Sequence, residues 1–168
     1  MDDAAVIYRL SREDGVKRFL PDQVYRDEAE AAGVLHYLIG QYSKPEAARS
    51  AAYVQAVELK GSGELIGHVG LSPAAVERET EIGYAIAETH QGKGYATELV
   101  RETVRWALDD LELPCVLAIV HTDNLASIRV LSKTGFALLD ERKRMLHGAL
   151  ALVRTYKATA NTWLKVRD

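Results

Sequence analysis

The sequence lacks the features that mark secreted, membrane-spanning and nucleic-acid-binding proteins. Its 168 residues include one cysteine, Cys115, so no internal disulfide framework can form and a reducing compartment is expected. No apolar run approaches the ~18 residues of a membrane span, and the acidic start MDDAAVIYRL has no signal-peptide pattern. The net charge of −3 argues against nucleic acid as the main partner, because a phosphate backbone requires a basic surface. We therefore expect a cytoplasmic protein without membrane or nucleic-acid partners.

What the chain does contain is an ordinary globular composition, with 48% hydrophobic and 27% charged residues. A chain of this length fits one domain and can bury a core without disulfides or metal. It shows no internal repeat, low-complexity tract or linker. A single domain over residues 1–168 is expected, with no metal site.

Hydrophobic periodicity predicts an α+β domain with a mixed sheet. In helix 26–42 the buried side is expected at Ala31, Leu35, Leu38 and Ile39. The charge run DERKRM, residues 140–145, is interpreted as a solvated face of a hairpin. The full predicted order is helices 2–13 and 26–42, strands 51–60, 65–71 and 80–88, helix 94–113, strand 115–121, helix 123–135, and strands 136–146 and 149–158.

The stretch HQGKGYATEL, residues 90–99, places two glycines directly before the long helix. Glycine permits positive φ, and a helix N-terminus offers unpaired N–H groups that bind anions. A pyrophosphate is the natural occupant, with Lys93 adding charge. A plain turn is the competing interpretation. A P-loop is excluded because its G-x-x-x-x-G-K-[ST] pattern is missing, and a G-x-G-x-x-G fingerprint is disfavoured because Thr97 replaces its third glycine.

Two motifs in a fixed order carry a family resemblance. QGKGYA has the form Gln/Arg-x-x-Gly-x-Gly/Ala between a strand and a long helix, and DNLASIRVLSKTGF follows a buried strand. Together with GELIGHVGL, they resemble the GNAT superfamily of acetyl-CoA-dependent N-acetyltransferases, most closely the bacterial ribosomal-protein N-terminal acetyltransferases. The resemblance is strongest over residues 64–136.

The resemblance implies a GNAT fold, in which a mixed, mostly antiparallel central sheet is splayed between two parallel strands and flanked by helices. Strands 80–88 and 115–121 would be those two neighbours. Family members usually begin with a strand before the first helix. Here either that strand is missing or AVIYRL, residues 5–10, forms it.

The resemblance also implies that acetyl-CoA (coenzyme A) binds along the splay as co-substrate. Its pantetheine would pair with the strand edge, and its pyrophosphate would lie on the glycines. For Asn124 and Ser127, the alternative role is capping of the helix in the second motif. For Lys133, the alternative is a place on the solvated face of that helix. The implied contacts are Tyr84, Ala85, Ile86, Ala87, Gln91, Gly92, Lys93, Gly94, Tyr95, Ala96, Thr97, Asn124, Ser127 and Lys133.

The implied reaction is direct attack of a primary amine on the thioester. Glu81 matches a glutamate that several family members carry and is the candidate base, against the alternative of an exposed or ion-paired strand residue. Ser127 matches the serine of an Asn-x-x-Ser motif and would donate to the forming thiolate. An amide near Ile86 is the expected oxyanion donor. Lesser candidates are Glu141 and His121 as base and Tyr84, Tyr95 and Tyr156 as acid, while Cys115 is expected in the core.

The acceptor is expected to be an amine of a protein N-terminus or a small molecule. At pH 7 an α-amine is neutralised at a cost of about 1 kcal/mol and a lysine-like amine at about 4.6 kcal/mol. Only the second requires a strong base or desolvation. Transfer of another acyl group, a non-catalytic acyl-CoA sensor and a non-enzymatic dimerising domain are the alternative functions. A homodimer is left open.

Overall fold

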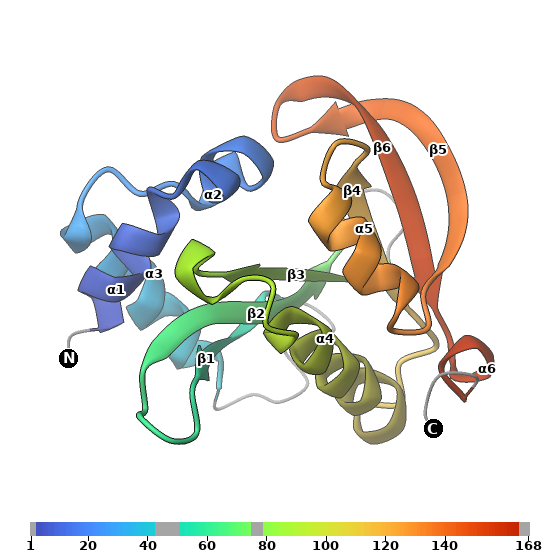
Figure 1. Cartoon of the computed structure of the whole chain (residues 1–168), viewed down its shortest axis with the longest axis horizontal. Helices are drawn as coiled ribbons and strands as arrows, with labels where there is room; N and C mark the ends of the chain where they lie inside the picture. The colour runs from blue at the N-terminus through green and yellow to red at the C-terminus, as the bar shows by residue number, and fades with distance from the viewer. Residues whose placement is uncertain (1–2, 43–50, 75–78, 165–168) are drawn as a thin grey trace.

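The computed structural model describes residues 3–42, 51–74 and 79–164. They form a six-stranded sheet of order β1-β2-β3-β4-β6-β5 (Figure 1). Neighbouring strands are antiparallel except β3 and β4, which are parallel. This confirms the predicted mixed, mostly antiparallel sheet. The strands are β1 (Tyr53–Glu58), β2 (Leu65–Pro73), β3 (Thr80–Ile86), β4 (Val116–His121), β5 (Ala137–Leu146) and β6 (Ala149–Ala158).

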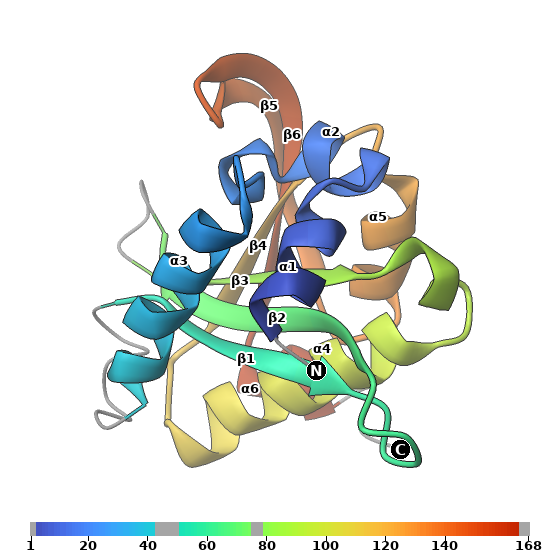
Figure 2. The same ribbon diagram turned by 90° about the vertical axis from the view of Figure 1, so that its left-hand side faces the viewer.

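Helices cover both faces of this sheet (Figure 2). No helix of the described residues is long and apolar enough to cross a membrane. One face carries α1 (Asp3–Ser11), α2 (Asp14–Phe19) and α3 (Glu28–Gln41), and the other carries α4 (Tyr95–Arg105) and α5 (Leu125–Ser132). Short elements complete the fold: η1 (Pro21–Gln23), η3 (Glu88–His90), the π-helical η4 (Trp106–Asp110) and α6 (Ala160–Trp163).

Strand β3 separates the two hydrophobic clusters because alternate residues of a strand face opposite sides. Ile82 belongs to the larger cluster, with Val100 of α4. Ala85 belongs to the smaller one, with Leu10 of α1 and Val16 of α2. Even-numbered β3 residues therefore face α4 and α5, and odd-numbered ones face α1 and α2.

The N-terminal region differs from the sequence prediction. Residues 5–10 are helical within α1, so AVIYRL is not a strand, and no strand precedes β1 among the described residues. Helix α2 was not predicted, because six residues before the Leu20–Pro21 step are too few to show a helical period. Ile39 was wrongly assigned to the buried side of α3 and is 58% exposed.

The predicted helix 94–113 and the C-terminus also need correction. α4 ends at Arg105 and widens into the π-helical η4, where the Leu111 amide donates to the Trp106 carbonyl at 3.0 Å. Such a bond spans five residues rather than four, and hydrophobic periodicity does not distinguish the two. Helix α6 was not predicted either. It is capped by Thr159 and buries Trp163.

A close approach of β2 and β3 requires glycine at position 67. A methyl group there would overlap the main-chain oxygen of Ala85, whereas one on Gly83 would meet nothing within 4 Å. We expect Gly67→Ala to lower the free energy of unfolding by roughly 1–3 kcal/mol through overpacking. Gly83→Ala, the matched strand control, should change it little. Urea unfolding of both variants checks this, and equal effects would contradict it.

The burial of His68 on β2 predicts that the free energy of unfolding depends on pH. Its Nε2 lies 2.7 Å from Gln23 Oε1, its Nδ1 has no hydrogen-bond partner, and burial lowers its pKa from 6.5 to about 4. Above pH 6.5 both folded and unfolded states keep the ring neutral. Between pH 6.5 and 4 only the unfolded state binds the proton, so stability falls as pH falls, by about 3 kcal/mol in total.

Comparing urea unfolding of wild type and His68→Gln across this pH range isolates the contribution of the imidazole. The variant should lose the corresponding part of the pH dependence. An unchanged slope between pH 6.5 and 4 would contradict this account, because it would show that His68 binds its proton equally well in the folded and unfolded states.

Candidate active site

The sheet opens between β3 and β4. These strands pair only through Thr80 with Val116 and Glu81 with Leu117. Beyond that point β3 stays with β2 and β4 stays with β6, and the two strands diverge (Figure 1). From Ile82 onward, one edge of β3 therefore has no strand beside it among the described residues. This is the splay that the family resemblance implies.

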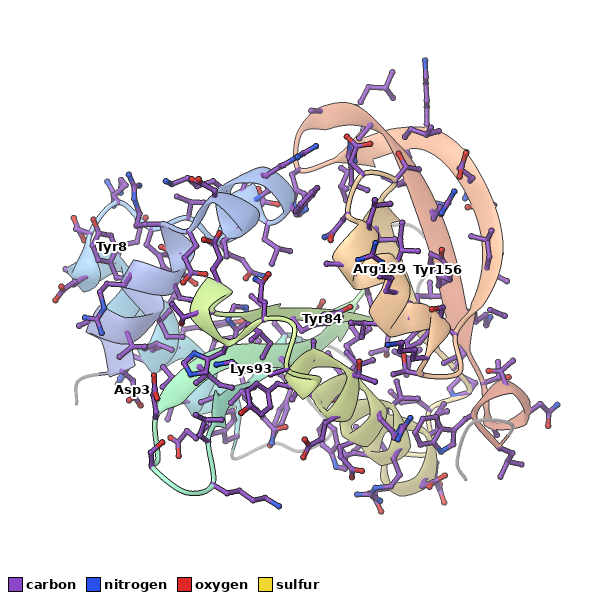
Figure 3. The ribbon with its side chains drawn as sticks, in the orientation of Figure 1. Asp3, Tyr8, Tyr84, Lys93, Arg129 and Tyr156 are labelled. Carbon is purple, nitrogen blue, oxygen red and sulfur yellow. The ribbon has the colours of Figure 1, made fainter. Side chains whose placement is uncertain are left out.

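A cleft of about 740 Å³ occupies this splay, within the usual range for ligand sites. It contains Glu81 and every predicted cofactor contact except Ala87 and Lys93. Ala87 instead packs with the small cluster beneath α2. Lys93 is exposed between the two glycines of the loop (Figure 3). The sequence motifs, far apart in the chain, thus converge on one cavity.

The glycine loop has the conformation that anion binding requires. Gly92 and Gly94 have φ of 76° and 92°, and Gly94 is the N-cap of α4. No atom lies within 4 Å of where a Cβ would be on either residue, so the space in front of the loop is open. The first N–H groups of a helix generally lack intrahelical acceptors and point out of its end, although in α4 the Thr97 amide already donates to the Gly94 carbonyl at 3.0 Å. An anion at this end would also be favoured by the helix dipole.

Gln91 holds this loop against the end of β3. Its Nε2 donates to the Ile86 carbonyl at 2.9 Å. The side chain therefore closes the loop onto the open strand edge. Gln91 was predicted to contact the cofactor. It lines the cleft, and its side chain also stabilises the loop.

Two hydroxyl groups meet where β3 faces α5. Tyr84 Oη and Ser127 Oγ are 2.8 Å apart, and Tyr84 is joined in the cleft by Arg129 of α5 (Figure 3). Burial raises the pKa of Tyr84 to about 12, although the hydrogen bond with Ser127 opposes this rise. The phenol consequently stays protonated through the physiological range. The pair can donate a proton or a hydrogen bond into the cleft.

Asn124 holds the main chain of this serine. Its Oδ1 accepts from the Ser127 amide at 3.1 Å, as the N-cap of α5. The capping alternative is therefore confirmed for Asn124. Because the cap uses the amide of Ser127, the hydroxyl remains available to Tyr84.

Glu81 lies at the closed end of the splay, in the last residue pair between β3 and β4. Its odd position places it on the α1 and α2 side of the strand, whereas Tyr84 faces α4 and α5. The cleft thus has a carboxylate on one face of β3 and the hydroxyl pair on the other.

Helix α2 bridges the open end of the splay. At its start, Gly15 N donates to Glu88 Oε1 at 3.1 Å and Glu88 N donates to Glu13 Oε2 at 2.9 Å. Burial raises the pKa of Glu13. At its end, Arg18 Nη2 lies 3.1 Å from Asp123 Oδ2. The helix is therefore tied to the end of β3 and to the loop after β4.

Sequence reasoning missed this wall and the hairpin tip opposite it. The tip is joined to η1 by a hydrogen bond between His147 Nδ1 and Asp22 Oδ2. Arg144 lies within the charge run that was interpreted as solvated, yet its side chain is only 12% exposed. A short helix and a charged strand carry no sequence signal for a cavity. The missed lining residues are Glu13, Gly15, Val16, Phe19, Leu20, Asp22 and 144–147.

The lesser catalytic candidates differ in whether they line the cleft. His121 lines the cleft, where its Nδ1 accepts from the Asp123 amide at 3.1 Å and its ring lies 6.2 Å from that of Phe19. Glu141 lies outside the cleft and binds Arg154 at 2.6 Å. Cys115 is buried, which raises its thiol pKa. Tyr95 lines the cleft, whereas Tyr156 is a core residue.

Comparisons with known proteins agree with this geometry. A family model described as "Acetyltransferase (GNAT) domain" matches residues 1–137. The chain is 30% identical over 135 residues to the "uncharacterized N-acetyltransferase YoaA" of Bacillus subtilis (strain 168), covering 80% of this chain and 73% of that protein.

Solved structures share the fold. The ribosomal-protein-S5-alanine acetyltransferase of Vibrio fischeri superposes with a TM-score of 0.75 at 21% identity, covering 96% of this chain and 90% of that one. The spermidine N-acetyltransferase of Vibrio cholerae, in complex with CoA and spermine, gives 0.74 at 21% identity, covering 96% and 92%. With the family model spanning most of the chain, the protein belongs to the GNAT family of acetyltransferases.

Proposed function

We propose that this protein transfers an acetyl group directly from acetyl-CoA to a primary amine of a protein N-terminus or a small molecule. The observation that supports this most strongly is the meeting of three features in one cleft. These are the open edge of β3, the glycine loop at the start of α4, and the Tyr84–Ser127 hydroxyl pair.

The residues present fit coenzyme A. The open space before Gly92 and Gly94 accommodates a pyrophosphate against the first N–H groups of α4. Lys133 and Arg129 line the same cleft and add positive charge. Among the described residues, the unpaired edge of β3 from Ile82 to Ile86 offers main-chain groups for the amides of a pantetheine arm. Bound acetyl-CoA would supply the activated acetyl group.

The chain's own groups then act on the reaction from the two faces of β3. Glu81 would take the proton of the attacking amine on the α1 and α2 side. On the opposite side, Ser127 would donate a hydrogen bond to the departing thiolate, which then takes its proton from solvent, and Tyr84 would hold the serine hydroxyl in place. A main-chain N–H near Ile86 would stabilise the oxyanion.

The acceptor would enter between α2 and the β5–β6 tip, because those elements form the wall away from the glycine loop. A carboxylate base suits either amine class, since it offsets part of the cost of deprotonation. One solved relative acts on a ribosomal protein and another is a spermidine N-acetyltransferase, so both a peptide N-terminus and a small amine deserve testing.

Calorimetric titration with acetyl-CoA tests the binding half of the proposal. We expect Gly94→Glu, which adds bulk and negative charge, to weaken binding by on the order of 100-fold, because it displaces charge-assisted hydrogen bonds. Gly63→Glu is the matched control, since Gly63 also has positive φ (67°) but lies in an exposed turn outside the cleft. No binding by the folded wild type would refute the cofactor assignment.

Thiol release across a panel of amines tests the transfer half. Turnover with acetyl-CoA and at least one amine is expected, and a series of acyl-CoA thioesters reports acyl preference. Tight binding without any turnover would favour the sensor alternative.

The hydroxyl pair predicts a specific kinetic pattern. We expect Ser127→Ala to lower kcat by about 100-fold, as for loss of one hydrogen-bond donor to a group that gains charge in the transition state, with a smaller change in KM. Tyr84→Phe should lower kcat less, because it removes only the partner of the serine. Since the Tyr84 pKa is about 12, its donor form persists and causes no loss of kcat below about pH 10.

The helix cap serves as an internal control for this experiment. Ser127→Ala retains the amide that Asn124 caps, so the melting temperature should stay close to that of wild type. If steady-state kinetics show that both variants keep kcat within twofold of wild type, the two hydroxyl groups take no part in the reaction.

A further inference from the structure

Three apolar side chains line the cleft without belonging to the core. They come from three elements: Phe19 ends α2, Ile119 lies on β4, and Leu146 lies at the β5–β6 tip. Each is half-buried, and among the described residues neither hydrophobic cluster includes any of the three. Apolar side chains that face a cavity in this way offer an apolar surface to a ligand.

This apolar surface lies on the side of the sheet where the acceptor amine would enter. Ile119 is two residues beyond Leu117, the partner of Glu81, so it faces α1 and α2 as Glu81 does. Phe19 and Leu146 belong to the two walls, α2 and the β5–β6 tip, which face each other across the splay (Figure 1). The apolar surface is therefore close to the candidate base.

Gly83 leaves room for a ligand on the same side of β3. It lines the cleft two residues after Glu81, and residues two apart on a strand share a face. A Cβ on Gly83 would meet nothing within 4 Å. A group attached to the acceptor amine can therefore lie over Gly83, against Ile119 of the diverging strand.

The ring of Phe19 is held in place by its neighbours. The Arg18 guanidinium lies 4.9 Å from the ring centroid, and it is itself 3.1 Å from Asp123 Oδ2. The His121 ring lies 6.2 Å away at a tilt of 46°. A ring fixed before the ligand arrives loses little freedom on binding, which favours affinity.

The carboxylates near this surface are already bonded within the protein. Besides Glu81, the described lining of the cleft includes two, Glu13 and Asp22. Glu13 Oε2 accepts from the Glu88 amide at 2.9 Å, and Asp22 Oδ2 is hydrogen-bonded to His147 Nδ1. A second ammonium group on the acceptor would lose water here and would have to compete for these carboxylates, which makes its burial costly.

We propose that the acceptor side of the cleft contains an apolar subsite formed by Phe19, Gly83, Ile119 and Leu146. The preferred acceptor is then a primary amine that carries an apolar group and no second charge. This inference rests on the proposed acetyl transfer. The same chemistry is found in a small apolar amine and in a protein N-terminus that begins with an apolar residue.

A matched pair of amines tests the subsite. In 1,4-diaminobutane an ammonium group replaces the terminal methyl group of n-pentylamine, and the two chains have the same length. We expect kcat/KM with acetyl-CoA to be at least about 100-fold higher for n-pentylamine, because the second ammonium must be desolvated. Ethylamine should be poorer than n-pentylamine by roughly 50-fold, at about fourfold for each buried methylene.

Two variants test the residues. Gly83→Val fills the space over β3, so it should lower kcat/KM for n-pentylamine by about tenfold and for ethylamine by less than about twofold. Leu146→Ala should lower the preference for n-pentylamine over ethylamine severalfold. Leu152→Ala is the matched control on the same hairpin, because Leu152 is apolar and exposed but lies outside the cleft lining, and it should leave the preference unchanged. A ratio between two amines does not change if part of the protein is unfolded.

Peptides distinguish the two sources of the apolar group. A tetrapeptide that begins with leucine should exceed one that begins with serine in either case. If the leucine peptide also exceeds leucine amide by about tenfold, the source is a protein N-terminus. If the two are equal, the source is a small amine.

The outcomes separate this inference from the proposed function. Turnover in which 1,4-diaminobutane equals or exceeds n-pentylamine would overturn the apolar subsite and leave acetyl transfer standing. A Gly83→Val variant that loses the same factor on both amines would also overturn it. Binding of acetyl-CoA without turnover of any amine would overturn the proposed transfer and this inference with it.

Discussion

The early end of pairing between β3 and β4 is the constraint on which the site depends. Two residue pairs join these strands, after which each remains bonded only to its antiparallel neighbour. A parallel pair continued to the strand ends would fill the cleft with its own ladder. Because pairing stops at Glu81, an unpaired strand edge lies inside the protein, where it can bind an extended ligand with amide groups.

The elements around this opening each stabilise one part of it. Gln91 fixes the glycine loop to the end of β3, and Asn124 fixes the start of α5. Helix α2 connects the two diverging strands through Glu88 on one side and Asp123 on the other. These contacts join segments distant in sequence, so the opening is held by long-range polar bonds as well as by the two hydrophobic clusters beside β3.

Local patterns in the sequence predicted much of this arrangement. QGKGYA and DNLAS are short motifs whose glycine and capping roles are decided within a few residues, and both lie in the cleft as expected. The contact between Tyr84 and Ser127 joins residues 43 positions apart, and residue patterns alone do not report such a distance. Helix α2 is too short for a period, and Arg144 belongs to a charge run that usually indicates solvent. The wall formed by α2 and the β5–β6 tip was therefore the part of the cleft that sequence reasoning missed.

Hydrogen–deuterium exchange with and without acetyl-CoA tests the central claim most directly, because it reports on main-chain amides one segment at a time. If the ligand pairs with the open edge of β3 and rests on the start of α4, exchange should slow in peptides covering residues 82–87 and 92–97. Peptides from β1 should remain unchanged. Binding without protection in those two segments would show that the opening between β3 and β4 is not where the thioester is held.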